Sequence, residues 1–160
     1  MLKLLLQFAV LLFVIWPALT LWHELGHGLL PLVAGRAPVA IRLGAGKATF
    51  TVRIGRLRLG IAPVPLGVGW CDWTPPAKRA TAVVTYLLGP CASGAAALGM
   101  WLLARVSAGF MHELALAGAA IAFMQCMFTA VPMRYPRWFG PYADQPSDGL
   151  RAWTLATSSS

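Results

Sequence analysis

Long apolar runs alternate with shorter polar segments along this chain of 160 residues. Three apolar runs, at about 4–33, 80–106 and 108–131, are long enough for a helix to cross the ~30 Å hydrocarbon core of a bilayer. The first run exceeds that thickness at about 1.5 Å per residue, so we expect it to tilt, to project or to kink at Pro17 and Pro31. The pattern predicts an α-helical integral membrane protein with about three transmembrane helices.

Residues 36–73, between the first two runs, follow a different pattern. Polar and apolar residues alternate there in short runs that glycines interrupt, which is typical of strands and hairpins. Residues 51–54 and 58–61 flank a short turn at 55–57. We therefore expect a β-hairpin region between the first and second transmembrane helices.

The chain becomes polar and rich in proline after Pro132, and it includes a C-terminal segment, 141–153, that is too short to cross a membrane. We interpret residues 1–160 as a single membrane-embedded domain, made of the three spans, the β-hairpin region and this C-terminal segment.

Composition and charge agree with a membrane protein. Hydrophobic residues make up 58% of the chain and charged residues only 11%, whereas about 25% is usual for soluble domains. Most of the Lys and Arg residues lie at 36–79, so the positive-inside rule places this region in the cytoplasm of a multi-pass protein, as in a bacterial inner membrane. Such a juxtamembrane cluster indicates the lipid bilayer, and not nucleic acid, as the partner of the basic residues. These residues are Arg36, Arg42, Lys47, Arg53, Arg56, Arg58, Lys78 and Arg79.

The first apolar run contains the most distinctive polar residues of the chain. In a helix, His23 and His27 project from the same face, so both imidazoles can bind one Zn²⁺ at about 2.0–2.1 Å. Glu24 lies beside them as a general base for a water whose pKa zinc lowers toward ~7. Polar side chains within an apolar span are costly to bury and usually mark function, although an incidental polar patch is the alternative.

A catalytic zinc requires a third protein ligand. His112 and Glu113 begin the third span, on the outer face in the predicted topology and therefore away from the histidine pair. Asp148 follows a Pro-Ser turn and could begin a short helix that directs its carboxylate at the metal. Asp144 remains the alternative, and either acid could instead be a solvated loop residue.

These residues resemble the site-2 protease family of intramembrane zinc metalloproteases, in a minimal core form, over about 20–153. The stretch 23–28 is similar to the family's first-helix motif, which implies that the two histidines bind zinc and that the glutamate is catalytic. Asp148-Gly149 is similar to the family's Asp-Gly motif, which implies Asp148 as the third zinc ligand.

Three further stretches resemble motifs of the same family. Residues 62–70 are similar to its Pro-Leu-Gly-Gly stretch. Residues 88–93 resemble its Gly-Pro-x-x-Asn motif, with Ser93 in place of Asn, and 128–132 resemble its Phe-Asn-x-x-Pro motif, with Thr129 in place of Asn. The resemblance implies substrate-binding roles for Pro65, Leu66, Gly67, Ser93 and Thr129.

Gly89 and Pro90 have two interpretations. They can break or kink the second span, or Gly89 can let that span approach the helix that carries the histidines.

Together these features predict an intramembrane zinc metalloendopeptidase that hydrolyses transmembrane protein substrates near the cytoplasmic face. The substrate must become extended, and the strands within 40–70 either offer it an edge for β-augmentation or only cover the site. The alternative is a non-cleaving, zinc-binding regulatory membrane protein of the same fold, which the changes at Ser93 and Thr129 motivate. Glu24 separates the two functions, because a purely structural zinc does not need it.

Overall fold

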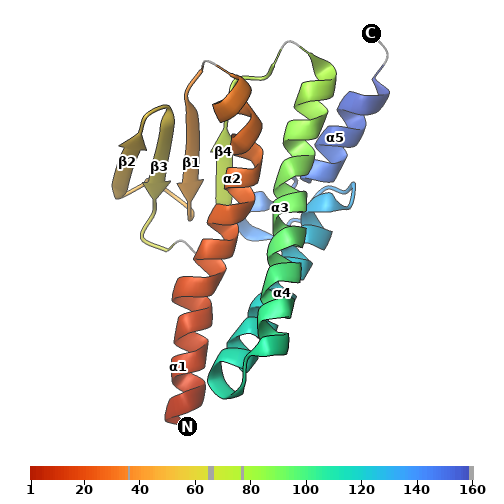
Figure 1. Ribbon diagram of the computed structural model, residues 1–160. Helices are drawn as coiled ribbons and strands as arrows, with labels where there is room; N and C mark the ends of the chain where they lie inside the picture. The colour runs from red at the N-terminus through yellow and green to blue at the C-terminus, as the bar shows by residue number, and fades with distance from the viewer. Residues whose placement is uncertain (36, 65–66, 77, 159–160) are drawn as a thin grey trace.

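The computed structural model describes residues 1–35, 37–64, 67–76 and 78–158 (Figure 1). Three of its helices are long and apolar enough to cross a membrane, and a four-stranded sheet lies between the first and the second of them in the chain. The elements are α1 (Leu2–Val10), η1 (Leu11–Ile15), α2 (Trp16–Ala34), β1 (Val39–Leu43), β2 (Phe50–Ile54), β3 (Leu57–Ile61), β4 (Gly69–Asp72), α3 (Arg79–Val106), α4 (Gly109–Ala130), η2 (Gly140–Tyr142) and α5 (Asp148–Thr157).

The first span is continuous from Leu2 to Ala34 and comprises α1, a π-helical turn and α2. Pro17 lacks the N–H group that would continue the α-helical pattern, and the π turn lies directly before it, at Leu11–Ile15. Pro31 lies inside α2, which runs on to Ala34. The irregularity expected at Pro17 is therefore a wide turn just before it, whereas at Pro31 the helix continues without interruption.

The other two spans, α3 and α4, form an antiparallel helical hairpin (Figure 1). α3 continues through Gly89 and Pro90, so the break that these residues could have caused is absent. The turn between α3 and α4 lies at the same end of the molecule as the N-terminus, and the sheet and α5 lie toward the other end (Figure 1). Small residues are buried in these two helices, as close helix packing in membranes requires; they include Ala104, Ala115, Gly118, Ala119 and Ala122.

Large apolar side chains are exposed along all three spans. They include Leu5 and Phe13 in the first span, Leu98 in α3 and Phe123 in α4. Soluble proteins rarely expose contiguous apolar surface on this scale, whereas contact with lipid is favourable for such side chains. The exposure pattern therefore agrees with helices that span a membrane.

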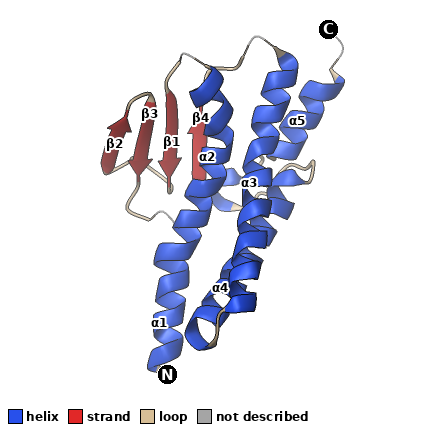
Figure 2. Cartoon of the chain, viewed as in Figure 1, coloured by secondary structure: helices blue, strands red, loops and turns tan. Residues whose placement is uncertain are grey.

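The sheet has the strand order β2-β3-β1-β4, so β2 and β4 form its edges and β3 lies inside (Figure 2). β2 and β3 are an antiparallel hairpin around Gly55 and Arg56, and Gly55 has the positive φ that the first central residue of a type II′ turn needs. This confirms the predicted turn, except that Leu57 already belongs to β3. β1 runs parallel to β3 and antiparallel to β4.

The sheet packs against α2 through the buried side chains Val39, Ile41 and Leu43 of β1. Leu21 and Leu25 of α2 pack against them. Each such aliphatic side chain stabilises the fold by about 1.5–3 kcal/mol when it is buried. This packing holds β1 and β4 beside the part of α2 that carries the histidines.

Candidate metal centre

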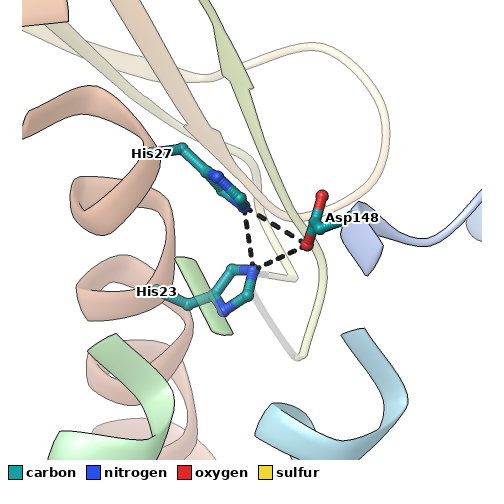
Figure 3. Close-up of side chains that lie close together, drawn as sticks. All are labelled: His23, His27 and Asp148. Carbon is teal, nitrogen blue, oxygen red and sulfur yellow. Dashed lines mark hydrogen bonds and ion pairs between the residues drawn. The ribbon is translucent and has the colours of Figure 1, made fainter. Parts of the chain in front are cut away.

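Two histidines of α2 face a common point inside the protein (Figure 3). Four residues separate His23 from His27, so both project from one face of the helix. Both residues are almost fully buried, with 3% and 5% of their surface exposed, and their Nε2 atoms lie 3.2 Å apart.

The carboxylate of Asp148 completes the group from the first residue of α5 (Figure 3). Its Oδ2 atom lies 3.3 Å from Nε2 of each histidine. The hydroxyl of Ser147 caps α5 by accepting a hydrogen bond from the Leu150 N–H, and it donates another to the Val131 carbonyl. The cap therefore holds Asp148 in a defined place next to the end of α4.

Gly149, the second residue of α5, has no room for a side chain. A Cβ atom here would collide with the carbonyl oxygen of Ala130 at the end of α4. Only glycine therefore lets the first turn of α5 pack this closely against α4, which brings Asp148 to the histidines.

The surroundings of Asp148 favour its ionised form. Burial by itself would raise the pKa of this carboxyl, but hydrogen bonds from His23 and His27 outweigh burial and hold the pKa below its ordinary value. Metal ligands must be deprotonated, so the carboxylate is in the state that metal binding requires.

The spacing of the three donor atoms fits a tetrahedral metal. The Nε2–Nε2 distance is 3.2 Å and both Nε2–Oδ2 distances are 3.3 Å, which is a nearly equilateral triangle. Ligand atoms at three corners of a tetrahedron with bonds of about 2.0–2.1 Å are separated by about 3.3–3.4 Å. His23, His27 and Asp148 can therefore hold one metal ion, and within the described part of the chain no further His, Cys, Asp or Glu joins this group.

Hydrogen bonds on the far side of each imidazole orient the two histidines. Nδ1 of His27 lies 2.9 Å from the Thr85 carbonyl oxygen, which can only accept, so Nδ1 carries a proton. Nε2 then offers a lone pair to a metal once it loses the proton that it donates to Asp148. Nδ1 of His23 lies 2.9 Å from the hydroxyl oxygen of buried Ser93. Such partners fix the ring and tautomer of metal-binding histidines.

α3 approaches the metal-binding helix at glycines. A Cβ atom on Gly26 of α2 would lie 2.5 Å from the Leu88 carbonyl oxygen of α3, so the two backbones are in contact. A Cβ atom on Gly89 would overlap the imidazole ring of His27. The close approach to the histidine-bearing helix that Gly89 could allow is therefore present in the structure.

Glu24 lies next to this group and also next to the sheet. Its side chain is only 6% exposed, and a Cβ atom on Gly69, the first residue of β4, would lie 2.5 Å from its Oε1 atom. The Tyr142 hydroxyl accepts a hydrogen bond from the Gly69 N–H at 2.6 Å and donates one to the Gly69 carbonyl at 2.8 Å. Burial raises the pKa of Tyr142, so its hydroxyl stays protonated and able to donate.

The other acidic candidates lie elsewhere. Asp144 is exposed, with its Oδ2 atom 3.6 Å from Nε of Arg137, so the alternative third ligand does not join the histidines. Glu113 pairs with Lys3 at 2.8 Å, at the opposite end of the helices from the metal group. Of the two acids that the sequence offered as a third donor, Asp148 is therefore the one that lies with the histidines.

The five residues predicted to bind substrate differ in what surrounds them in the structure. Pro65 and Leu66 lie outside the described residues. Gly67 has a positive φ and packs against the Trp16 ring, and the Thr129 hydroxyl donates to the Gln125 carbonyl of its own helix at 2.8 Å. Their substrate-binding roles stay predictions. Ser93 contacts Nδ1 of His23 directly, so its partner belongs to the candidate metal group.

Two residues that contact the candidate site or its neighbour Gly69 could not be predicted from the sequence. Thr85 acts through its backbone carbonyl, which no side-chain pattern can reveal. Tyr142 lies in a polar, proline-rich stretch, far along the chain from the glycine that it binds.

Comparison with protein-family models gives no match, and comparison with the curated proteins gives none either.

Proposed function

We propose that this protein is an intramembrane zinc metalloendopeptidase of the site-2 protease kind, which hydrolyses peptide bonds of transmembrane substrates near the cytoplasmic face. The observation that carries the proposal is the position of Glu24. This buried carboxylate lies on the same helix as the two histidines, close enough to His27 and Asp148 to interact with them electrostatically, and it packs against the backbone of an edge strand. A metal that served structure alone would have a closed set of four protein ligands and no need of a neighbouring acid.

The donor set supports zinc as the metal. Two imidazole nitrogens and one carboxylate oxygen, with a fourth position open, are typical of catalytic zinc. The same residue types also bind ferrous iron in octahedral sites. Donors at right angles around a metal with bonds of about 2.1 Å would lie only about 3.0 Å apart. The observed separations of 3.2–3.3 Å are closer to the tetrahedral value.

Each residue of the site then has a defined task. Zinc, when bound, supplies a Lewis acid that makes a coordinated water nucleophilic near neutral pH. Glu24 accepts the proton of the attacking water and delivers it to the nitrogen of the leaving amine. Ser93 and Thr85 keep the two imidazoles in the orientation for binding through Nε2.

The edge strand β4 supports a way to hold the substrate. A peptide bond within a helix is sheltered by the helix's own hydrogen bonds, so the substrate must be extended before hydrolysis. An extended peptide can add to the free side of β4 by β-augmentation, which brings its backbone next to Glu24. β3 cannot offer this edge, because β1 and β2 pair with it on both sides.

The orientation in the membrane follows from the same arrangement. The sheet, which carries much of the basic cluster at 36–79, and α5 lie toward the end of the molecule opposite the N-terminus (Figure 1). We place this end at the cytoplasmic face, where basic residues favour the anionic lipid surface. The metal group would then be open toward the cytoplasm.

The test compares the wild-type chain with Glu24→Gln on a panel of single-span substrates in cells. We expect the substitution to lower cleavage by about 10²- to 10⁴-fold, as loss of a general base does, while the purified protein keeps its zinc. Glu113→Gln is the matched control, because it changes the other glutamate of the spans at the far end of the helices.

Equal processing by wild type and Glu24→Gln would end the protease proposal. A wild-type protein that binds zinc but cleaves no substrate would favour the regulatory alternative, and iron in place of zinc would overturn the metal assignment.

A further inference from the structure

The backbone of Gly69 points away from the sheet. Leu43 of β1 stands opposite Gly69 of β4 in the antiparallel pair. The neighbouring pair is hydrogen-bonded, because the Gly44 N–H donates to the Val68 carbonyl at 2.7 Å. Bonded and non-bonded pairs alternate along an antiparallel ladder. The N–H and C=O of Gly69 therefore face the free side of β4, where another strand would pair.

The Tyr142 hydroxyl occupies this pairing position. It accepts from the Gly69 N–H at 2.6 Å and donates to the Gly69 carbonyl at 2.8 Å, so one oxygen satisfies the two groups that a neighbouring strand would bind. The Tyr142 ring also packs against Trp70 of β4, with ring centroids 5.5 Å apart. One side chain thus covers the edge at the residue that touches Glu24.

Tyr142 belongs to a compact loop between α4 and α5, which we call the cover segment (133–147). Its two arms are joined by backbone hydrogen bonds from Tyr135 N–H to the Gln145 carbonyl and from Ser147 N–H to the Met133 carbonyl, both at 2.9 Å. The second of these lies directly before Asp148, whereas Tyr142 lies in the turn η2 between the arms. The bonds that hold Asp148 in place are thus separate from those that Tyr142 makes to Gly69.

We propose that the cover segment is a latch on the free edge of β4, and that an extended substrate peptide displaces the Tyr142 hydroxyl from Gly69 to pair with β4. This inference rests on the proposed function, because it concerns how substrate reaches the same site. The latch keeps the edge satisfied until a peptide offers equivalent hydrogen bonds. It also protects an edge strand that would otherwise pair with other chains.

Removing the hydroxyl weakens the latch and leaves the ring in place. In Tyr142→Phe the Gly69 N–H and C=O lose their partner, and two neutral hydrogen bonds correspond to about 5- to 100-fold in an equilibrium constant. We expect the Gly69 amide to exchange with deuterium faster by this factor. We also expect KM for a cleaved substrate to fall several-fold with little change in kcat, because substrate no longer competes with the hydroxyl.

The experiment uses the full chain in lipid nanodiscs, with hydrogen–deuterium exchange of peptides that span 67–73. Binding of a synthetic single-span transmembrane peptide is measured in the Glu24→Gln background, so that the bound peptide stays intact. Tyr135→Phe is the matched control: its hydroxyl lies in the same segment but donates to the Phe128 carbonyl of α4 at 3.4 Å. Zinc content is compared throughout to show that Asp148 remains in place.

The inference holds if Tyr142→Phe, and not Tyr135→Phe, speeds exchange at Gly69 and tightens peptide binding with zinc retained. Unchanged exchange at Gly69 overturns it. Faster exchange with weaker peptide binding or a higher KM also overturns it, because Tyr142 would then position the substrate. If wild type and Glu24→Gln process substrates equally, the proposed function fails, while exchange and peptide binding still decide whether the latch exists.

Discussion

The substitution Gly89→Ala tests whether the close approach of α3 to α2 is needed to keep His27 in place at the candidate metal centre. The added Cβ atom would lie 2.7 Å from Cδ2 of His27 and closer still to Nε2, the donor atom. Ordinary contact begins at 3.4 Å, so the ring has to move by more than about 0.7 Å or the helices have to separate by a similar amount. Metal–ligand distances tolerate only about 0.2 Å, so His27 would leave its place in the donor triangle.

The expected loss of zinc affinity can be bounded from below. Removing a hydrogen-bond partner that merely orients a ligand costs about 10- to 100-fold in affinity. Displacing the ligand itself should cost at least about 100-fold, or about 2.7 kcal/mol. Overpacking would add about 1–3 kcal/mol of destabilisation if the helices cannot adjust.

The measurement is zinc affinity of the purified protein by competition with a chromophoric chelator, with helical content followed by circular dichroism. Gly99→Ala is the control, because it adds the same methyl group to α3 where no atom lies within 4 Å of the new Cβ. Undiminished zinc affinity in a folded Gly89→Ala protein would show that the contact between α3 and His27 is not as close as described.

Two further predictions concern the donors and their partners. Asp148→Asn should remove most bound zinc, because it replaces a charged donor 3.3 Å from both imidazoles, whereas Asp144→Asn should retain it; normal zinc in the former would refute the assignment of the third ligand. Ser93→Ala should weaken zinc binding by about 10- to 100-fold, because His23 loses its hydrogen-bond partner. Thr129→Ala is the control and should keep the wild-type affinity, because its hydroxyl is bonded within its own helix. Equal zinc affinities of the two variants would show that Ser93 does not orient His23.

Much of the architecture was predictable because it depends on local patterns. The expected spans at 4–33, 80–106 and 108–131 correspond to helices at Leu2–Ala34, Arg79–Val106 and Gly109–Ala130, since length and hydropathy alone identify such helices. The hairpin around Gly55 followed from strand alternation and a glycine at the turn. The histidine pair followed from helical spacing.

The rest depends on contacts between segments that are distant in the chain. Nothing local indicates that β1 pairs in parallel with β3, because that register is set when β1 packs on α2. The choice of Asp148 over Asp144 depends on Gly149, which lets α5 approach α4, and on the cap that Ser147 provides. The sequence favoured Asp148, and this acid, not Asp144, lies with the histidines, but the packing that brings it there is visible only in three dimensions.

The contact of Ser93 differs from the role that the resemblance implies for this position. It stands where the resemblance implies an asparagine with a substrate-binding role, and its hydroxyl instead meets Nδ1 of His23 at 2.9 Å. α3 can bring this short side chain so near because Gly26 and Gly89 let the two backbones touch. The substitution is therefore compatible with an intact metal centre, so it does not by itself favour a non-cleaving protein.

In the proposed function, the metal group and the edge that would hold the substrate are built from different elements. His23, His27 and Asp148 depend on the packing of α2, α3 and α5, whereas Gly69 depends on β4 and the cover segment. Glu24 belongs to α2 but touches Gly69, so this residue joins the two parts. Proton transfer in peptide hydrolysis needs such a junction, because the same carboxylate must reach the water at the metal and the nitrogen of a peptide held along the strand. Variants at Gly89 and Tyr142 therefore probe separate halves of one site, and Glu24→Gln probes the point where they meet.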